Sequence, residues 1–256
     1  MCIRDRFWNR ADLVRLALEI VMVVKSVHEL PFSSLIGDIC LENFLASPCN
    51  SQRRGSKQPR IWSVDCDSYH LPEFPSEMGR PVFSSRRLLL TASDNSYSDV
   101  DYCRRELEDE LFAVALLLFQ VLVSLGNGLP YGRAAGAQGI EFGFFPFKKE
   151  GVSGHEPKRM VGNWLQLGAK LQDLFIHVFG NAKVKPDSIS QEAWRTRLKS
   201  PENWWELEKP NSVSLEKWEF ELKAYLRKCE DPESSFDSRK KVSSPVDLSL
   251  TPWRPN

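Results

Sequence analysis

The feature that most constrains the fold is a nearly unbroken apolar run, LFAVALLLFQVLV, from Leu111 to Val123. A membrane-spanning helix needs about 20 such residues, and this run is too short. Because the run is apolar on nearly every side, we expect residues 106–124 to form a helix surrounded by protein. Gly126 and Asn127 follow it, and both suit a left-handed helix cap, so we expect the helix to end there.

Other helices are predicted from apolar spacing. A helical stripe of apolar residues extends from Asn9 to Leu30, and Pro31 cannot continue it. His28 then marks the end of this helix. A second amphipathic segment runs from Asn163 to Val178, with Asn163 available as its N-cap. Further helices are expected at 187–198 and 218–229.

Strand signals are few. The stretches Phe44–Ala46 and Ile61–Val64 flank a polar, basic loop and predict a short β hairpin. Residues 71–101 are rich in Pro, Ser and Asp without a clear period, and loops of this length are usually functional or mobile. Phe142, Phe144, Phe145 and Phe147 are expected to fill a core seam. The predicted fold class is therefore mainly α with short β hairpins.

Charge and cysteine content narrow the surroundings of the chain. Basic and acidic residues balance at 34 each, so no long-range field favours nucleic acid or an anionic membrane. The six cysteines form no CxxC pair, and no signal peptide is apparent. Reduced thiols in a cytoplasmic protein fit this pattern better than a disulfide framework or a zinc site. We therefore expect this chain to bind neither nucleic acid nor a membrane.

Three polar side chains in apolar surroundings suggest chemistry. Asp38 and Asn43 have the spacing D-x-x-x-x-N in LIGDICLENFLASP, and Asp65 follows the second predicted strand in VDCDS. Phosphoryl transfer needs a carboxylate to orient the attacking hydroxyl and hard oxygen ligands for a divalent metal. The alternative for Asp38 and Asn43 is an ordinary polar turn. In the same motif, Cys66 is expected to be an apolar plug and Asp67 a turn residue.

With these motifs in order along the chain, residues from about 12 to about 198 resemble the C-terminal lobe of the protein-kinase fold. The chain is most similar to a bacterial kinase-like family that has Gly-Asp for His-Arg-Asp and Asp-Cys-Asp-Ser for Asp-Phe-Gly. Some members of that family carry a helix-hairpin-helix DNA-binding appendage. Gly37-Asp38 and residues 65–68 match the two signatures, and the apolar run resembles the lobe's central helix. That helix usually opens with Asp, where Glu110 stands here.

The resemblance implies a site and its cofactors. Asp38 would be the catalytic base, Asn43 and Asp65 would bind Mg²⁺ and the ATP cofactor, and a Ser or Thr hydroxyl of a protein substrate would accept the phosphoryl group. Residues 71–101 would form the activation segment. Gly37 replaces the arginine that would pair with a phosphorylated segment, so control by that pairing is not expected. SSRR (84–87) replaces the usual Pro-Pro-Glu, and Lys185 stands where an arginine closes the ion pair.

The N-terminal side departs further from the resemblance. The sequence contains no glycine-rich phosphate loop and no strand-borne lysine, so we expect the N-lobe to be missing and this fragment to be inactive alone. MCIRDR (1–6) resembles a translated sequencing adapter. The expected organisation is 1–6 adapter artefact, 7–208 C-lobe, and 209–256 C-terminal helix with a loosely ordered tail. Two other functions stay open: a non-catalytic kinase-like scaffold, and an aminoglycoside-type phosphotransferase. The second family normally has a His before the Gly-Asp pair, whereas Ile36 stands there in this sequence.

Overall fold

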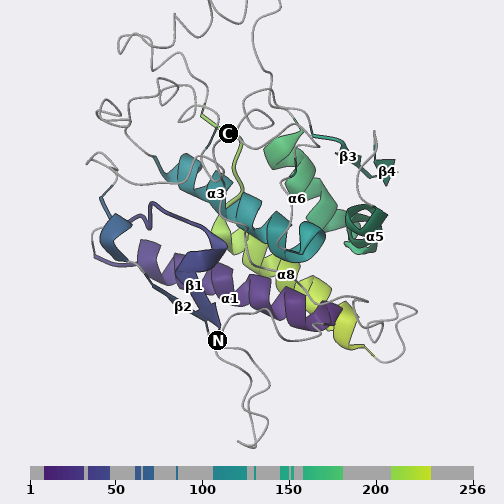
Figure 1. The fold of residues 1–256 in the computed structure, drawn as a ribbon, viewed down its shortest axis with the longest axis horizontal. Helices are drawn as coiled ribbons and strands as arrows, with labels where there is room; N and C mark the ends of the chain where they lie inside the picture. The colour runs from purple at the N-terminus through teal and green to yellow at the C-terminus, as the bar shows by residue number, and fades with distance from the viewer. Residues whose placement is uncertain are drawn as a thin grey trace, which may run out of the picture.

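The computed structural model describes residues 9–31, 34–46, 61–64, 66–71, 85, 106–125, 130, 145–149, 151–152, 158–180 and 209–231. This part of the chain is mainly helical, as the sequence predicts (Figure 1). Its helices are α1 (Arg10–His28), α3 (Leu107–Phe119), α5 (Lys158–Gln166), α6 (Ala169–Phe179) and α8 (Leu215–Glu230). Its strands form two antiparallel pairs, β1 (Phe44–Ala46) with β2 (Ile61–Ser63) and β3 (Phe147–Lys148) with β4 (Gly151–Val152).

Helix α3 lies at the centre of the core. All its side chains from Asp109 to Phe119 are buried, which confirms the prediction from the apolar run. The helix then widens into a π-helical turn, Gln120–Ser124. The predicted cap at Gly126 or Asn127 is wrong, because Leu125 takes the left-handed conformation, with φ of 56°. That conformation costs about 1–2 kcal/mol. Burial of the Leu125 side chain offsets it by about 1.5–3 kcal/mol.

The N-terminal helix and the C-terminal helix pack side by side (Figure 1). Asn9 is the N-cap of helix α1, and its side chain accepts from the Asp12 amide at 2.9 Å. The predicted extent of the helix is confirmed. Helix α8 is antiparallel to α1, since Arg15 near the start of α1 pairs with Glu230 at the end of α8. The predicted helix at 218–229 is thus confirmed and is longer than expected.

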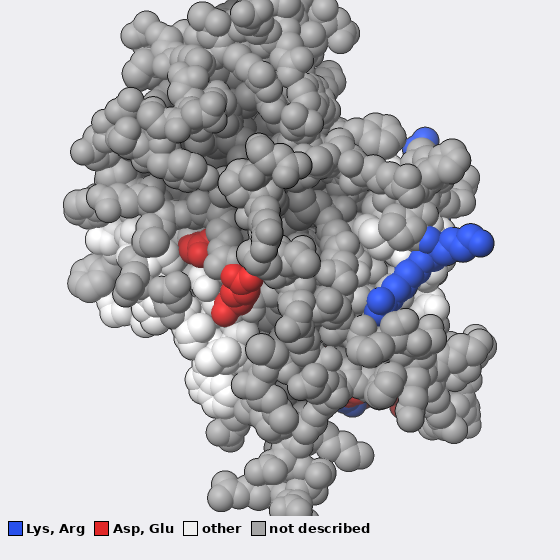
Figure 2. Space-filling model, viewed as in Figure 1, with Lys and Arg blue, Asp and Glu red and all other residues white. Residues whose placement is uncertain are grey.

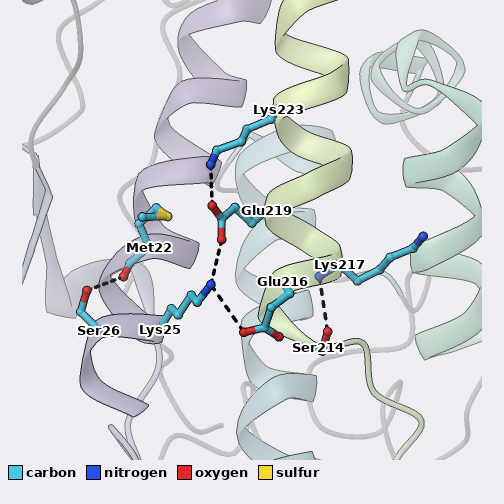
Figure 3. A network of polar contacts seen from close by, with 8 residues as sticks. All are labelled: Met22, Lys25, Ser26, Ser214, Glu216, Lys217, Glu219 and Lys223. Carbon is cyan, nitrogen blue, oxygen red and sulfur yellow. Dashed lines mark hydrogen bonds and ion pairs between the residues drawn. The ribbon is translucent and has the colours of Figure 1, made fainter. Parts of the chain in front are cut away.

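An ion-pair network joins the other ends of these two helices (Figure 3). Lys25 Nζ lies 3.1 Å from Glu219 and 3.6 Å from Glu216, and the bond to Glu219 raises the Lys25 pKa. Exposed ion pairs contribute little to stability. Burial of the apolar face of α8, which includes the fully buried Trp218 and Leu222, therefore contributes more to holding this helix in place than the ion pairs do.

The prediction of one helix from Asn163 to Val178 is wrong. The chain forms α5 and α6 instead, with a break at Leu167–Gly168. Asn163 lies inside α5, and its Nδ2 donates to the Val123 carbonyl in the π-helical turn at 2.8 Å. At the break, a Cβ on Gly168 would lie 3.3 Å from the Tyr225 ring, so glycine allows α8 to approach closely.

Aromatic rings fill the space between α3, α5 and α6. Phe145 and Phe147 join this cluster, which confirms the prediction for these two; Phe142 and Phe144 lie outside the described residues. The Phe119 ring centroid is 5.3 Å from that of Phe147, in an edge-to-face arrangement. Such pairs add about 0.5–1.5 kcal/mol beyond burial. The other members of the cluster are Trp164, Phe175, Phe179, Phe112 and Trp218.

One buried cation connects four parts of the core. Arg10 in α1 donates from Nη1 to the Leu122 carbonyl at 2.7 Å and from Nη2 to the Asn163 carbonyl at 3.2 Å. Its Nε donates to the Tyr225 hydroxyl at 3.3 Å, and its guanidinium lies 5.8 Å from that ring's centroid. The same hydroxyl donates to the Gln166 carbonyl, and burial raises the Tyr225 pKa. Arg10 thus holds α1, the π-helical turn, α5 and α8 together.

The described surface carries charges of both signs. On the face shown in Figure 2, basic side chains lie toward α5, whereas acidic side chains lie on the opposite side. Among the described helices, none combines the length and apolar character needed to cross a membrane.

We expect Arg10→Met to lower the free energy of unfolding by about 3 kcal/mol, because buried acceptors lose a charged donor. The control is Arg227→Met on the exposed side of α8, which should change it by no more than about 0.5 kcal/mol. Denaturant titration followed by circular dichroism measures both. Similar losses in the two variants would contradict the assigned role of Arg10.

Candidate functional site

The β1–β2 hairpin positions Asn43, which is 4% exposed. The strands pair as predicted, with Phe44 opposite Ser63 and Ala46 opposite Ile61. The Val64 amide extends the ladder by donating to the Asn43 carbonyl at 2.9 Å. Because Phe44 and Ile61 are buried, the hairpin is held on its inner side and Asn43 is held with it.

The structure brings Asp38 and Asn43 together, as the sequence predicts. Asn43 Nδ2 donates to the Asp38 carboxylate at 3.1 Å and to the Asp38 carbonyl at 2.8 Å. A short 3₁₀ turn, Leu41–Asn43, folds the chain back so that this contact can form. The half-buried Asp38 carboxylate is thus held at a defined place beside the start of β1.

Gly37 makes a turn that a side chain would not allow. Its φ is +81°, and the Asp38 amide donates to the Ile36 carbonyl at 3.0 Å, the hydrogen-bond pattern of a γ-turn. A Cβ on Gly37 would lie 2.5 Å from the Ser68 carbonyl oxygen. The left-handed region and the close backbone approach both require glycine here. This turn sets the direction in which the chain enters Asp38.

The two motifs singled out in the sequence lie side by side. Leu35 and His70 form an isolated antiparallel bridge, with reciprocal amide-to-carbonyl distances of 2.8 and 3.0 Å. Between them, Ser68 Oγ donates to the Ile36 carbonyl at 2.6 Å. The Gly-Asp segment is therefore bound directly to the end of the Asp-Cys-Asp-Ser segment.

A buried carboxylate on α3 holds the same turn from the other side. The Glu110 side chain is fully buried; Oε1 accepts from the Ile36 amide at 3.0 Å and Oε2 from the Gly37 amide at 2.9 Å. His28 Nε2 lies 2.6 Å from Oε1. Two successive backbone amides bound by one carboxylate leave the turn little freedom to move. Glu110 therefore fixes the backbone that leads into Asp38.

The neighbouring carboxylates of α3 bind other segments. Ser85 Oγ, fully buried, donates to Asp109 Oδ1, so at least this residue of SSRR is held on α3. Lys209 pairs with Glu106 and Glu108, and Glu106 is the main cause of its raised pKa. The first turn of α3 thus binds three parts of the chain that are far apart in sequence.

The third predicted site residue, Asp65, lies outside the described residues, so its proposed contact with the other two stays a prediction. On either side of it, Val64 binds Asn43 and Cys66 begins a 3₁₀ turn that ends at Ser68. Cys66 is exposed, so the prediction of an apolar plug is wrong. Among the described residues, no three His, Cys, Asp or Glu side chains gather as a metal site would require.

Sequence reasoning missed one contact of this site. His28 is the last residue of α1, as predicted, but its ring also reaches Glu110, 82 residues further along the chain. No spacing or motif signals such a contact, because it depends on how α1 packs against α3. Of the predicted activation segment, residues 71–101, the structure describes Leu71 and Ser85. Its other residues lie outside the described residues, and so does Lys185.

No protein-family model matches the sequence, and no curated protein matches it.

Gly37→Ala should lower the free energy of unfolding by at least about 2 kcal/mol, because the new Cβ meets the Ser68 carbonyl and φ is left-handed. The matched control is Gly162→Ala, where a Cβ would meet nothing within 4 Å in helix α5. There we expect a gain of about 0.5–1 kcal/mol. Thermal or urea unfolding compares the two. Equal behaviour of both variants would contradict the assigned turn geometry.

Proposed function

We propose that the chain is part of an ATP- and Mg²⁺-dependent phosphotransferase of the protein-kinase type, which modifies Ser or Thr hydroxyls of a protein. One observation carries the proposal: the Asp38 carboxylate and the Asn43 amide meet at 3.1 Å on a turn that a buried carboxylate holds in place. The glycine that position 37 requires and the buried Glu110 carboxylate together fix the direction in which the turn presents Asp38, and this fixed placement supports a functional role.

Each residue has a proposed role. Asp38 is the base that orients the acceptor hydroxyl and takes its proton. Asn43 uses its amide nitrogen on Asp38, so the atom that it offers to a cation is its amide oxygen. Asp65 is the second proposed cation ligand, and the backbone bond between Val64 and Asn43 supports this role.

The donor set fits the cofactor. Carboxylate and amide oxygens are the hard ligands that Mg²⁺ prefers, and Asn43 and Asp65 are the residues that would hold it. Bound with ATP, the metal would neutralise charge on the phosphates. The protein's own contribution is to position the reacting groups. It keeps the Asp38 carboxylate fixed beside the start of β1, which removes much of the entropic cost of orienting it toward the acceptor hydroxyl.

A non-catalytic scaffold is the second candidate function. The observation that favours it is the Ser85–Asp109 hydrogen bond, in which the donor is an uncharged hydroxyl, since the resemblance would place an ion pair at the end of the activation segment. Such a bond suits a protein that presents a binding surface to a partner and catalyses no reaction. Metal binding distinguishes the two functions, because a scaffold has no need of it.

We expect Mn²⁺, added with ATP as a paramagnetic substitute for Mg²⁺, to broaden the amide resonances of Asn43 and Val64 selectively. Asp65→Asn should reduce this broadening about tenfold, since it removes a charged ligand. The control is Asp173→Asn, a carboxylate on α6 that pairs with Lys149, and it should have no effect. Uniform weak broadening in all proteins would favour the scaffold.

These 256 residues alone should show no phosphoryl transfer, because the sequence ahead of Asp38 offers no glycine-rich loop and no predicted lysine-bearing strand to hold the ATP phosphates. Transfer of radiolabel from ATP to a general protein acceptor measures this. Measurable transfer that Asp38→Asn abolishes would show that those elements are not needed.

A further inference from the structure

His28 has a partner that its place at a helix end does not explain. Its side chain is 14% exposed, and Nε2 lies 2.6 Å from Oε1 of the fully buried Glu110. Helix α1 ends without help from this ring, because the Glu29 amide already binds the Lys25 carbonyl at 3.0 Å. His177, in the last turn of α6, occupies a similar position but is exposed.

The buried carboxylate needs the donor that His28 supplies. Ile36 and Gly37 give Glu110 one backbone amide bond to each oxygen, and His28 gives a further bond to Oε1. An ionised carboxylate has no proton to donate, so in its bond with Glu110 the imidazole donates from Nε2. A buried carboxylate is costly unless its oxygens are supplied with hydrogen bonds, and the ring adds a third donor to the two amides.

The bond also determines the orientation of the carboxylate. The two amide bonds lie on adjacent residues of one turn, so they restrain the carboxylate from one side. His28 approaches from α1, a separate rigid element, and restrains it from another side. With the ring removed, the carboxylate could rotate away from one amide, and the turn before Asp38 would gain freedom.

We propose that His28 is a positioning residue, which orients the Glu110 carboxylate so that it binds both turn amides and thereby fixes the backbone that carries Asp38. Its relevance to phosphoryl transfer rests on the proposed function, but the positioning itself does not. The coupling passes from the end of α1, through the first turn of α3, to the Gly37 turn.

Amide hydrogen exchange, resolved by residue with NMR, tests the proposal on the 256-residue chain. His28→Leu should accelerate exchange at Ile36 and Gly37 by about tenfold or more, since a buried charge-assisted bond is lost. His28→Gln keeps an N–H donor of similar reach and should stay within about threefold of the wild type. Amides of α6 and α8 should be unchanged, and so should all amides in the control His177→Leu.

A second variant covers the case in which His28→Leu does not fold. His28→Asn is polar but too short to reach Glu110, so it should accelerate the same two amides while His28→Gln does not. The proposal is overturned if Ile36 and Gly37 exchange as in the wild type. It is equally overturned if exchange rises by one common factor throughout the chain, which is the signature of lost global stability.

The same samples separate this inference from the proposed function. Selective acceleration at the two amides, with no Mn²⁺ broadening at Asn43 in any protein, supports the positioning role and contradicts the phosphotransferase. Selective Mn²⁺ broadening in the wild type, with no change of exchange in His28→Leu, supports the phosphotransferase and overturns the positioning role.

Discussion

The arrangement of the site depends on one buried carboxylate. Glu110 projects from the first turn of α3 into a place without solvent, where it binds two successive backbone amides and a histidine ring. A buried carboxylate must have such donors, and the Gly37 turn must have an acceptor for its amides. Each requirement satisfies the other, so the central apolar helix α3 and the Gly37 turn are tied together.

Helix α3 begins with Glu106 as its N-cap and with Glu108, Asp109 and Glu110 in its first turn. Carboxylates are favourable at this end of a helix, because its unpaired amides and its dipole are positive there. Their partners come from three directions: Lys209, Ser85, and the turn with His28. The same acidic turn that begins the central helix thus organises the surface around the candidate site. Its separate bonds also hold Ser85 and the Gly37 turn on the same end of α3.

Two described residues, Leu125 and Gly37, have a left-handed backbone conformation. Leu125 is left-handed because the π-helical turn before it shifts the helix end, and its full burial offsets the cost. Gly37 is left-handed because the Ser68 carbonyl approaches too closely for any side chain. The first is stabilised by packing, whereas the second sets the direction in which the chain enters Asp38, so these two left-handed positions, with φ of 56° and 81°, have different physical causes.

The sequence by itself determined the helix at 106–124, the helix of residues 10–28, the short hairpin and the convergence of Asp38 with Asn43. Those features follow from local periodicity and spacing, which a linear chain carries directly. Only the tertiary structure decided the break at Gly168, the left-handed Leu125, the exposure of Cys66 and the contact of His28 with Glu110. Three of these depend on which elements meet in space. The break at Gly168 depends on α8, the conformation of Leu125 on α5 against the π-helical turn, and the His28 contact on α1 against α3. Such contacts join residues far apart in the chain, where no local pattern records them.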